Sequence, residues 1–175
     1  MSPPLPAELP PEVLEIADPH QIFILPTRDL ESSNSTVEWW RTNRLVRVVR
    51  GDRMATIAGV HEEFAAAFQF PLYYGTNLDA FVDSLAQPVE TPVVDARICL
   101  VANAEYFMSL EPERLSEIAA CLAEVREEWA LNRGGPEDRT PLAFSVVLAP
   151  DGYFREVRDA WLKAGAVPRR LGHKN

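Results

Sequence analysis

Residues 47–85 read RVVRGDRMATIAGVHEEFAAAFQFPLYYGTNLDAFVDSL, and the hydrophobic spacing changes within this stretch. The β-branched start, which ends at Gly51, predicts a strand. From residue 57 to 68 the apolar side chains recur every three or four positions, which predicts a helix that ends before Pro71. Asn77 is a good N-cap for a second, shorter helix. The apolar stripe of that second helix is Leu78, Phe81, Val82 and Leu85.

Strands and helices also alternate on both sides of this stretch. Short apolar runs predict strands at 21–25 (QIFIL), 98–102 (ICLVA) and 143–149 (AFSVVLA). Helical spacing predicts a long helix from Pro112 to Trp129 and a last helix from Phe154 to Gly165. Strands separated by helices favour parallel pairing with right-handed crossovers, so we expect a layered α/β fold. The segment VEWWR at 37–41 fits a short helix or a short strand, and the sequence does not decide between them.

The acidic residues are concentrated in the middle of the chain. The 175 residues carry a net charge of −9, whereas residues 54–131 alone hold 13 acidic and 3 basic residues, a net charge of −10. Binding to phosphates needs clustered lysine and arginine, so this balance argues against nucleic acid or an anionic membrane as a direct partner. No stretch approaches the roughly 18 apolar residues that span a bilayer, and the first residues lack a secretory signal pattern. We therefore expect a cytoplasmic protein.

Two carboxylates of the second helix form the first candidate site. Asp79 and Asp83 lie one helical turn apart, and like charges at this spacing cost a helix about 0.2–0.5 kcal/mol. The helix dipole favours Asp79, which follows the N-cap by two residues, but it does not favour Asp83. An ordinary solvated helix face explains the pair as well as a binding site does. The preceding loop, with two tyrosines and a glycine, favours a protein interface.

The string P-L-Y-Y-G-T-N-L-D-A-F-V-D, residues 71–83, resembles the barstar family of intracellular ribonuclease inhibitors. The resemblance covers residues 47–85 without a gap and continues to about residue 149 as an order of strands and helices. It implies a three-stranded parallel sheet packed with helices in residues 44–150. Outside it lie a proline-rich N-terminal extension, residues 1–43, and a C-terminal helical extension packed on the domain, residues 151–175.

The resemblance also implies a binding surface. Members occlude the basic active site of a ribonuclease with the second helix and the loop before it, and Asp83 matches their anchor. A further acid is expected on the long helix, where Glu127 is the best match and Glu124 and Glu128 compete. The expected partner-binding residues are Tyr73, Gly75, Asn77, Leu78, Asp79, Val82, Asp83 and Glu127. Val82 stands where the family has a tryptophan, so one aromatic contact of the family is missing, and this difference motivates the alternative of a different partner.

The sequence supports a catalytic or metal site less than it supports a protein-binding surface. His61-Glu62 begins like the zinc motif H-E-x-x-H, but residue 65 is alanine. A carboxylate-based Mg²⁺ enzyme using Asp79, Asp83 and Glu127 is the rival class. Cys99 and Cys121 fit buried small side chains, with a disulfide as the alternative.

We therefore expect an inhibitor of a ribonuclease or nuclease toxin. It would not be an enzyme, would need no cofactor or metal, and would be a monomer when free. The alternative is a protein-binding module on the same scaffold whose partner is not a nuclease.

Overall fold

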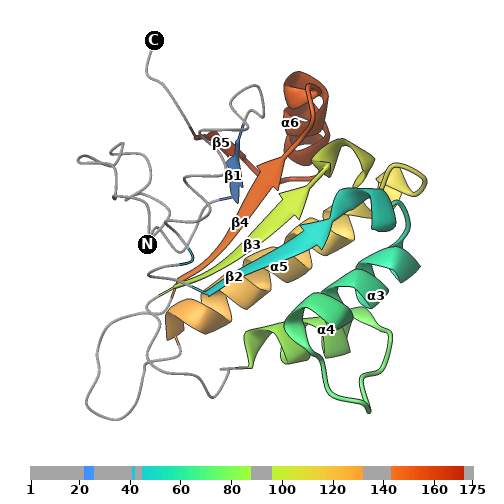
Figure 1. The fold of residues 1–175 in the computed structure, drawn as a ribbon, viewed down its shortest axis with the longest axis vertical. Coiled ribbons are helices and arrows are strands. Elements are labelled where there is room, and N and C mark those ends of the chain that lie inside the picture. The colour runs from blue at the N-terminus through green and yellow to red at the C-terminus, as the bar shows by residue number, and fades with distance from the viewer. Residues whose placement is uncertain (1–21, 26–40, 42–44, 88–95, 132–142, 172–175) are drawn as a thin grey trace, which may run out of the picture.

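The computed structural model describes residues 22–25, 41, 45–87, 96–131 and 143–171 (Figure 1). The strands are β1 (Ile22–Ile24), β2 (Leu45–Arg50), β3 (Ala96–Ala102), β4 (Ala143–Ala149) and β5 (Arg169–Arg170). The α-helices are α3 (Ile57–Phe68), α4 (Leu78–Ala86), α5 (Leu115–Leu131) and α6 (Phe154–Lys163). The short 3₁₀ helices are η3 (Gly51–Arg53), η4 (Ala104–Tyr106) and η5 (Pro112–Arg114). The proline-rich arm and residues 37–40 lie outside the described residues.

The five strands form one parallel sheet in the order β2-β3-β4-β1-β5. The α/β class and the parallel pairing are confirmed, but the expectation of three strands is wrong. The additional strands come from outside residues 44–150: Ile22 of β1 pairs with Val146, and Phe23 pairs with Arg169 of β5. The QIFIL run predicted the strand β1 but did not indicate which strand β1 pairs with. The strand β5 has only two residues, so its sequence shows no periodicity that could predict it.

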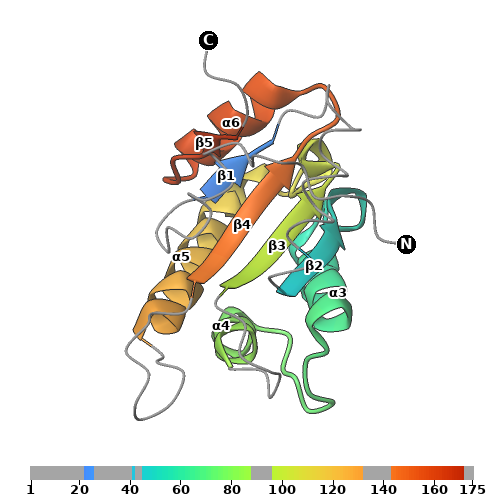
Figure 2. The ribbon, with the colours of Figure 1, turned by 60° about the vertical axis from the view of Figure 1, so that its left-hand side comes forward.

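Alternation along the strands separates two faces of the sheet. Helices α3, α4 and α5 lie on one face (Figures 1 and 2). The main core fills this face with Val49, Cys99, Val101, Phe144 and Val146 from the sheet. A smaller cluster lies on the other face and consists of Phe23, Ile98, Leu100, Val147 and Leu171. Period-2 alternation of side chains therefore assigns successive strand residues to opposite faces of the sheet.

The ends of the helices follow local signals in the sequence. Thr56 caps α3 by accepting a hydrogen bond from the Gly59 amide at 3.3 Å. Gln69 ends α3 in the left-handed region with φ of 54°, two residues before Pro71. Asn77 caps α4, as predicted, by accepting a hydrogen bond from the Ala80 amide at 2.8 Å.

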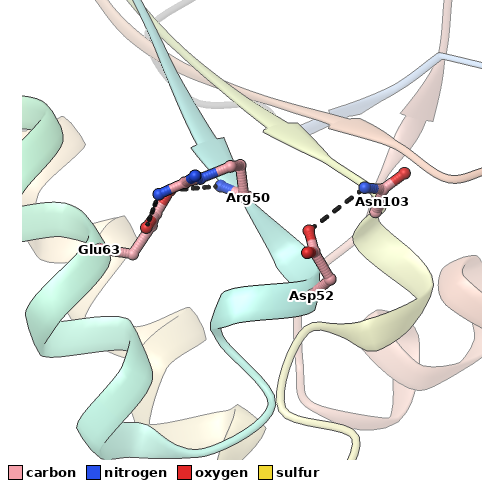
Figure 3. Close-up of polar contacts among 4 residues, drawn as sticks. All are labelled: Arg50, Asp52, Glu63 and Asn103. Carbon is pink, nitrogen blue, oxygen red and sulfur yellow. Dashed lines mark hydrogen bonds and ion pairs between the residues drawn. The ribbon is translucent and has the colours of Figure 1, made fainter.

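Polar contacts fix α3 against the carboxyl end of β2 (Figure 3). Arg50 donates two hydrogen bonds to the Glu63 carboxylate, from Nε at 2.7 Å and from Nη2 at 2.9 Å, and its backbone amide donates a third at 3.0 Å. Asn103 donates a hydrogen bond to Asp52 at 3.2 Å and so links the ends of β3 and β2. Gly51 is required at this junction, since a Cβ there would lie 2.1 Å from the Asn103 carbonyl oxygen. Helix α3 is thus held in a defined position next to α4.

Helix α6 packs into the same core as the central elements. Val157 and Trp161 are buried, and the Trp161 ring stacks on Phe107 at a centroid distance of 5.6 Å. Cys99 and Cys121 are both buried, free thiols. None of the helices in the described ranges is long and apolar enough to cross a membrane.

Candidate protein-binding site

The loop before α4 presents apolar side chains to solvent. This binding loop, residues 70–77, turns tightly because the Tyr74 amide donates to the Pro71 carbonyl at 2.9 Å and the Asn77 amide donates to the Gly75 carbonyl at 2.8 Å. Leu72 is fully exposed, and Tyr73 is 85% exposed. A large aromatic side chain that stays exposed on an ordered turn is typical of a protein contact surface.

The next residue of the loop, Tyr74, is half-buried and anchors the loop to α3. Its hydroxyl forms a hydrogen bond with Nδ1 of His61, and its ring packs edge-on against Phe70 at 4.8 Å. His61 in turn packs edge-on against Phe81 of α4 at 5.9 Å. Burial raises the pKa of Tyr74 to about 12, so its hydroxyl keeps its proton near neutral pH. The aromatic contacts hold the binding loop in one position relative to α3 and α4.

Helix α4 separates its acidic residues from its apolar ones. Phe81, Val82 and Leu85 are buried, whereas Asp79 and Asp83 are exposed. Val82 was expected among the partner-binding residues, but it is only 7% exposed and belongs to the core. Its place in the apolar stripe of α4 turns its side chain away from solvent. We therefore leave Val82 out of the contact surface.

The carboxyl end of α4 is held by two residues that the sequence did not indicate as contacts. The Leu85 carbonyl accepts hydrogen bonds from Trp129 Nε1 at 3.2 Å and from Arg97 Nη1 at 3.5 Å. The Arg97 guanidinium also lies 4.6 Å from the centre of the Trp129 ring. An arginine at the start of the apolar run RICLVA was the available signal, because a charged residue at that place must find a partner. Helix α4 is consequently fixed at both ends.

Helix α5 packs against α4 and carries acidic residues of its own. Burial, and then the charges of Glu124, Asp79 and Glu117, raise the pKa of Cys121, so Glu124 and Glu117 act on the same thiol as Asp79 of α4. Glu127 follows Cys121 by six residues, which is about 240° around the helix, and its charge acts on Arg126 instead. Glu124, Glu127 and Glu128 are all exposed. The charge of Glu124 therefore acts in the same region as that of Asp79, whereas Glu127 lies on another side of α5.

A groove with a volume of about 670 Å³ opens between the first turns of α3 and α4. Its lining residues are Ile57, Ala58, His61, Glu62, Thr76, Asn77, Leu78, Asp79 and Arg114. Three of the expected partner-binding residues, Asn77, Leu78 and Asp79, lie at its edge. The sequence did not indicate the contribution of α3 to this surface.

The carboxylates expected for a Mg²⁺ enzyme can be compared with the groups that a metal site requires. In the part of the chain that the structure describes, no three His, Cys, Asp or Glu residues are grouped so that they could hold an ion. Asp79, Asp83 and Glu127, the set expected for a Mg²⁺ enzyme, do not form such a group.

The comparison with family models identifies the relatives of this chain. Residues 44–149 match the family described as Barstar (barnase inhibitor). The chain belongs to the barstar family. This match confirms the resemblance found in residues 47–85 and extends it through β4. A search of curated protein sequences found no match.

Solved structures share the fold of this barstar-family protein at low sequence identity. One is the ORC2 protein of Aeropyrum pernix, with a TM-score of 0.53 and 13% identity over 95% of this chain and 49% of that one. Another is Drosophila ORC bound to DNA, with a TM-score of 0.53 and 11% identity over 91% of this chain and 27% of that one. The chain thus spans at most about half the length of these proteins. The likeness shows a shared fold alone.

Proposed function

We propose that this barstar-family protein binds a basic ribonuclease or nuclease toxin and occludes its active site with α4 and the binding loop. The observation that carries the proposal is the exposed pair Asp79 and Asp83 on α4, together with exposed Tyr73 in the loop that precedes this helix. The family match supports a protein partner of this class.

The proposed mechanism rests on charge complementarity. A ribonuclease must hold RNA phosphates with arginine, lysine or histidine groups, and carboxylates placed at the same positions pair with those groups. Neither Asp79 nor Asp83 forms an ion pair with another described residue, so both are available to the partner. The exposed side chains of Leu72 and Tyr73 would exclude water around these charged contacts. Inhibition would be stoichiometric, without catalysis by this chain.

Rigidity of the binding surface supports the same mechanism. The loop is held through Tyr74 and His61, the start of α4 is capped by Asn77, and the end of α4 is held through the Leu85 carbonyl. A surface that is ordered before binding loses less conformational entropy when the complex forms. We therefore infer that the free protein presents the contact surface in its binding conformation.

The alternative is a barstar-family module whose partner is not a nuclease. Val82 favours it, because this position carries a buried valine instead of the expected tryptophan. The two strands that lie outside the family match, β1 and β5, also distinguish this chain.

Affinity capture distinguishes the two functions. The wild-type protein and the Asp83→Ala variant are used as baits in a lysate, and the captured proteins are identified by mass spectrometry and assayed for RNA hydrolysis. We expect the wild type, but not the variant, to capture a basic protein whose ribonuclease activity it suppresses. A partner without nuclease activity that depends equally on Asp83 would favour the alternative.

A further inference from the structure

The groove between α3 and α4 adds a second element to the surface around Asp79. One wall is formed by Ile57, Ala58 and Glu62 on the first turns of α3, and the other by Leu78 and Asp79 of α4. Its volume of about 670 Å³ is large enough to enclose a long side chain from a partner. Because α3 is fixed to β2 and α4 is fixed to α5, the groove is present before a partner binds.

The charges that line the groove leave it negative. The carboxylates of Glu62 and Asp79 are exposed, and neither forms an ion pair with another described residue. The positive charge of Arg114 is offset by Glu117, which accepts two hydrogen bonds from it at 3.1 Å and 3.0 Å. Burial and the nearby Arg114 lower the pKa of His61, so this imidazole is neutral near pH 7. Two carboxylates therefore remain available to a cation.

The rest of the lining is suited to an aliphatic chain. Ile57 and Leu78 are half-buried, and Ala58 is exposed and small. Lysine and arginine place three or four methylene groups on apolar surface while the charged end contacts water or a carboxylate. A side chain of this kind matches both the apolar walls and the two acids of the groove.

We propose that this groove receives a lysine or arginine side chain of the nuclease and that Glu62 of α3 determines which nucleases fit. The inference rests on the proposed function and extends the contact surface from α4 to α3. The backbone of α3 that carries Glu62 is held in position because the neighbouring Glu63 binds Arg50, and because the Glu111 carboxylate accepts a hydrogen bond from the Ile57 amide at 2.6 Å. A nuclease without a cation at the matching position would leave both carboxylates unpaired and bind more weakly.

The first test uses L-arginine amide as a probe of the groove and requires no nuclease. In an NMR titration of the full chain, we expect the largest amide shifts at residues 57–62 and 76–79. Glu62→Gln should weaken this binding about threefold. Glu156→Gln, which removes the same charge from an exposed position on α6, should leave it unchanged. Equal binding by wild type and Glu62→Gln, or shifts spread evenly over the acidic surface, would overturn the inference.

The second test measures the dissociation constant of the complex with the nuclease that the wild type captures. We expect Glu62→Gln to weaken the complex about tenfold and Glu156→Gln to have no effect. If Asp83→Ala weakens the complex and Glu62→Gln does not, the inhibitor function stands and the groove inference is wrong. If wild type binds and inhibits no nuclease, the proposed function itself fails, and the assignment of a nuclease side chain to the groove fails with it.

Discussion

Asp83 is exposed on the outer face of α4, one helical turn after Asp79. The two carboxylates repel each other in the free protein, and the dipole of α4 offsets this repulsion only near Asp79. A partner that supplies cations replaces the repulsion with charge-assisted hydrogen bonds. The side chain that costs stability in the free protein is thus the one expected to contribute most to the complex.

Substitution of Asp83 should therefore change binding and stability in opposite directions. We expect Asp83→Ala to weaken the complex by about 2 kcal/mol or more, because it removes one member of a desolvated charge pair. The free energy of unfolding should rise by a few tenths of a kcal/mol. Titration calorimetry and chemical denaturation measure the two effects, with Asp159→Ala on α6 as the control. An unchanged affinity would show that Asp83 is not the anchor.

His61 makes the stability of the α3–α4 contact dependent on pH. Burial, and then Arg114, lower its pKa below the usual value of 6.5, so the unfolded chain binds a proton more readily than the folded protein does. The stabilising effect of neutral His61 is complete above about pH 6.5 and is lost as the pH falls below it. We expect the free energy of unfolding to decrease from pH 7 toward pH 5, and to decrease less in His61→Gln. Identical pH profiles for the two proteins would contradict this.

Sequence reasoning worked well for residues with local signals. Asn77 was predicted as a cap from its type and its place before an apolar stripe, and the structure confirms it. The inclusion of Val82 in the contact surface came from its match to a tryptophan position, whereas its place in the stripe with Phe81 and Leu85 indicated burial. The contact between His61 and Tyr74 spans a loop, and no local pattern indicates it.

At the scale of elements, α5 supplies both support and charge to α4. Trp129 holds the end of α4, and the charges of Glu124 and Asp79 both act on Cys121. The sequence predicted the span of α5 but left Glu124, Glu127 and Glu128 as alternatives. The packing of α5 against α4 determines which side of α5 faces α4. The spacing of residues along α5 does not by itself predict this orientation.

Glu124 and Glu127 should therefore differ in their effect on binding. We expect Glu124→Gln to weaken the nuclease complex about three- to tenfold, because its charge acts in the same region as that of Asp79 on α4. Glu127→Gln removes the same charge from another side of α5, about 240° around the helix from Cys121, and should have little effect. Surface plasmon resonance on both variants measures this difference. The reverse order of effects would place the contact on the other side of α5.

At the scale of the whole molecule, the sheet extends beyond the segment that matches the family. The strands β1 and β5 add to β4 on the side away from β2 (Figure 2). The sequence predicted the β1 strand, α6 and the parallel class, but pairing between residues more than 120 positions apart, such as Ile22 with Val146, leaves no local signal. The charge distribution is the other property of the whole chain, with −10 in residues 54–131.

This concentrated charge should accelerate association with a basic partner. We expect the association rate to fall at least about tenfold between about 0.01 M and about 1 M salt, as the screening length shortens from about 30 Å to about 3 Å. The dissociation rate should change less. Stopped-flow measurements of complex formation test this, and an association rate independent of salt would exclude electrostatic steering.

The most direct test of the account is a titration of nuclease activity. The nuclease captured by the wild-type protein is assayed for RNA hydrolysis while purified wild type or Asp83→Ala is added. The account predicts that activity falls linearly to zero at one equivalent of wild type, and that Asp83→Ala requires a much higher concentration. Full nuclease activity in the presence of excess wild-type protein would contradict the proposed function.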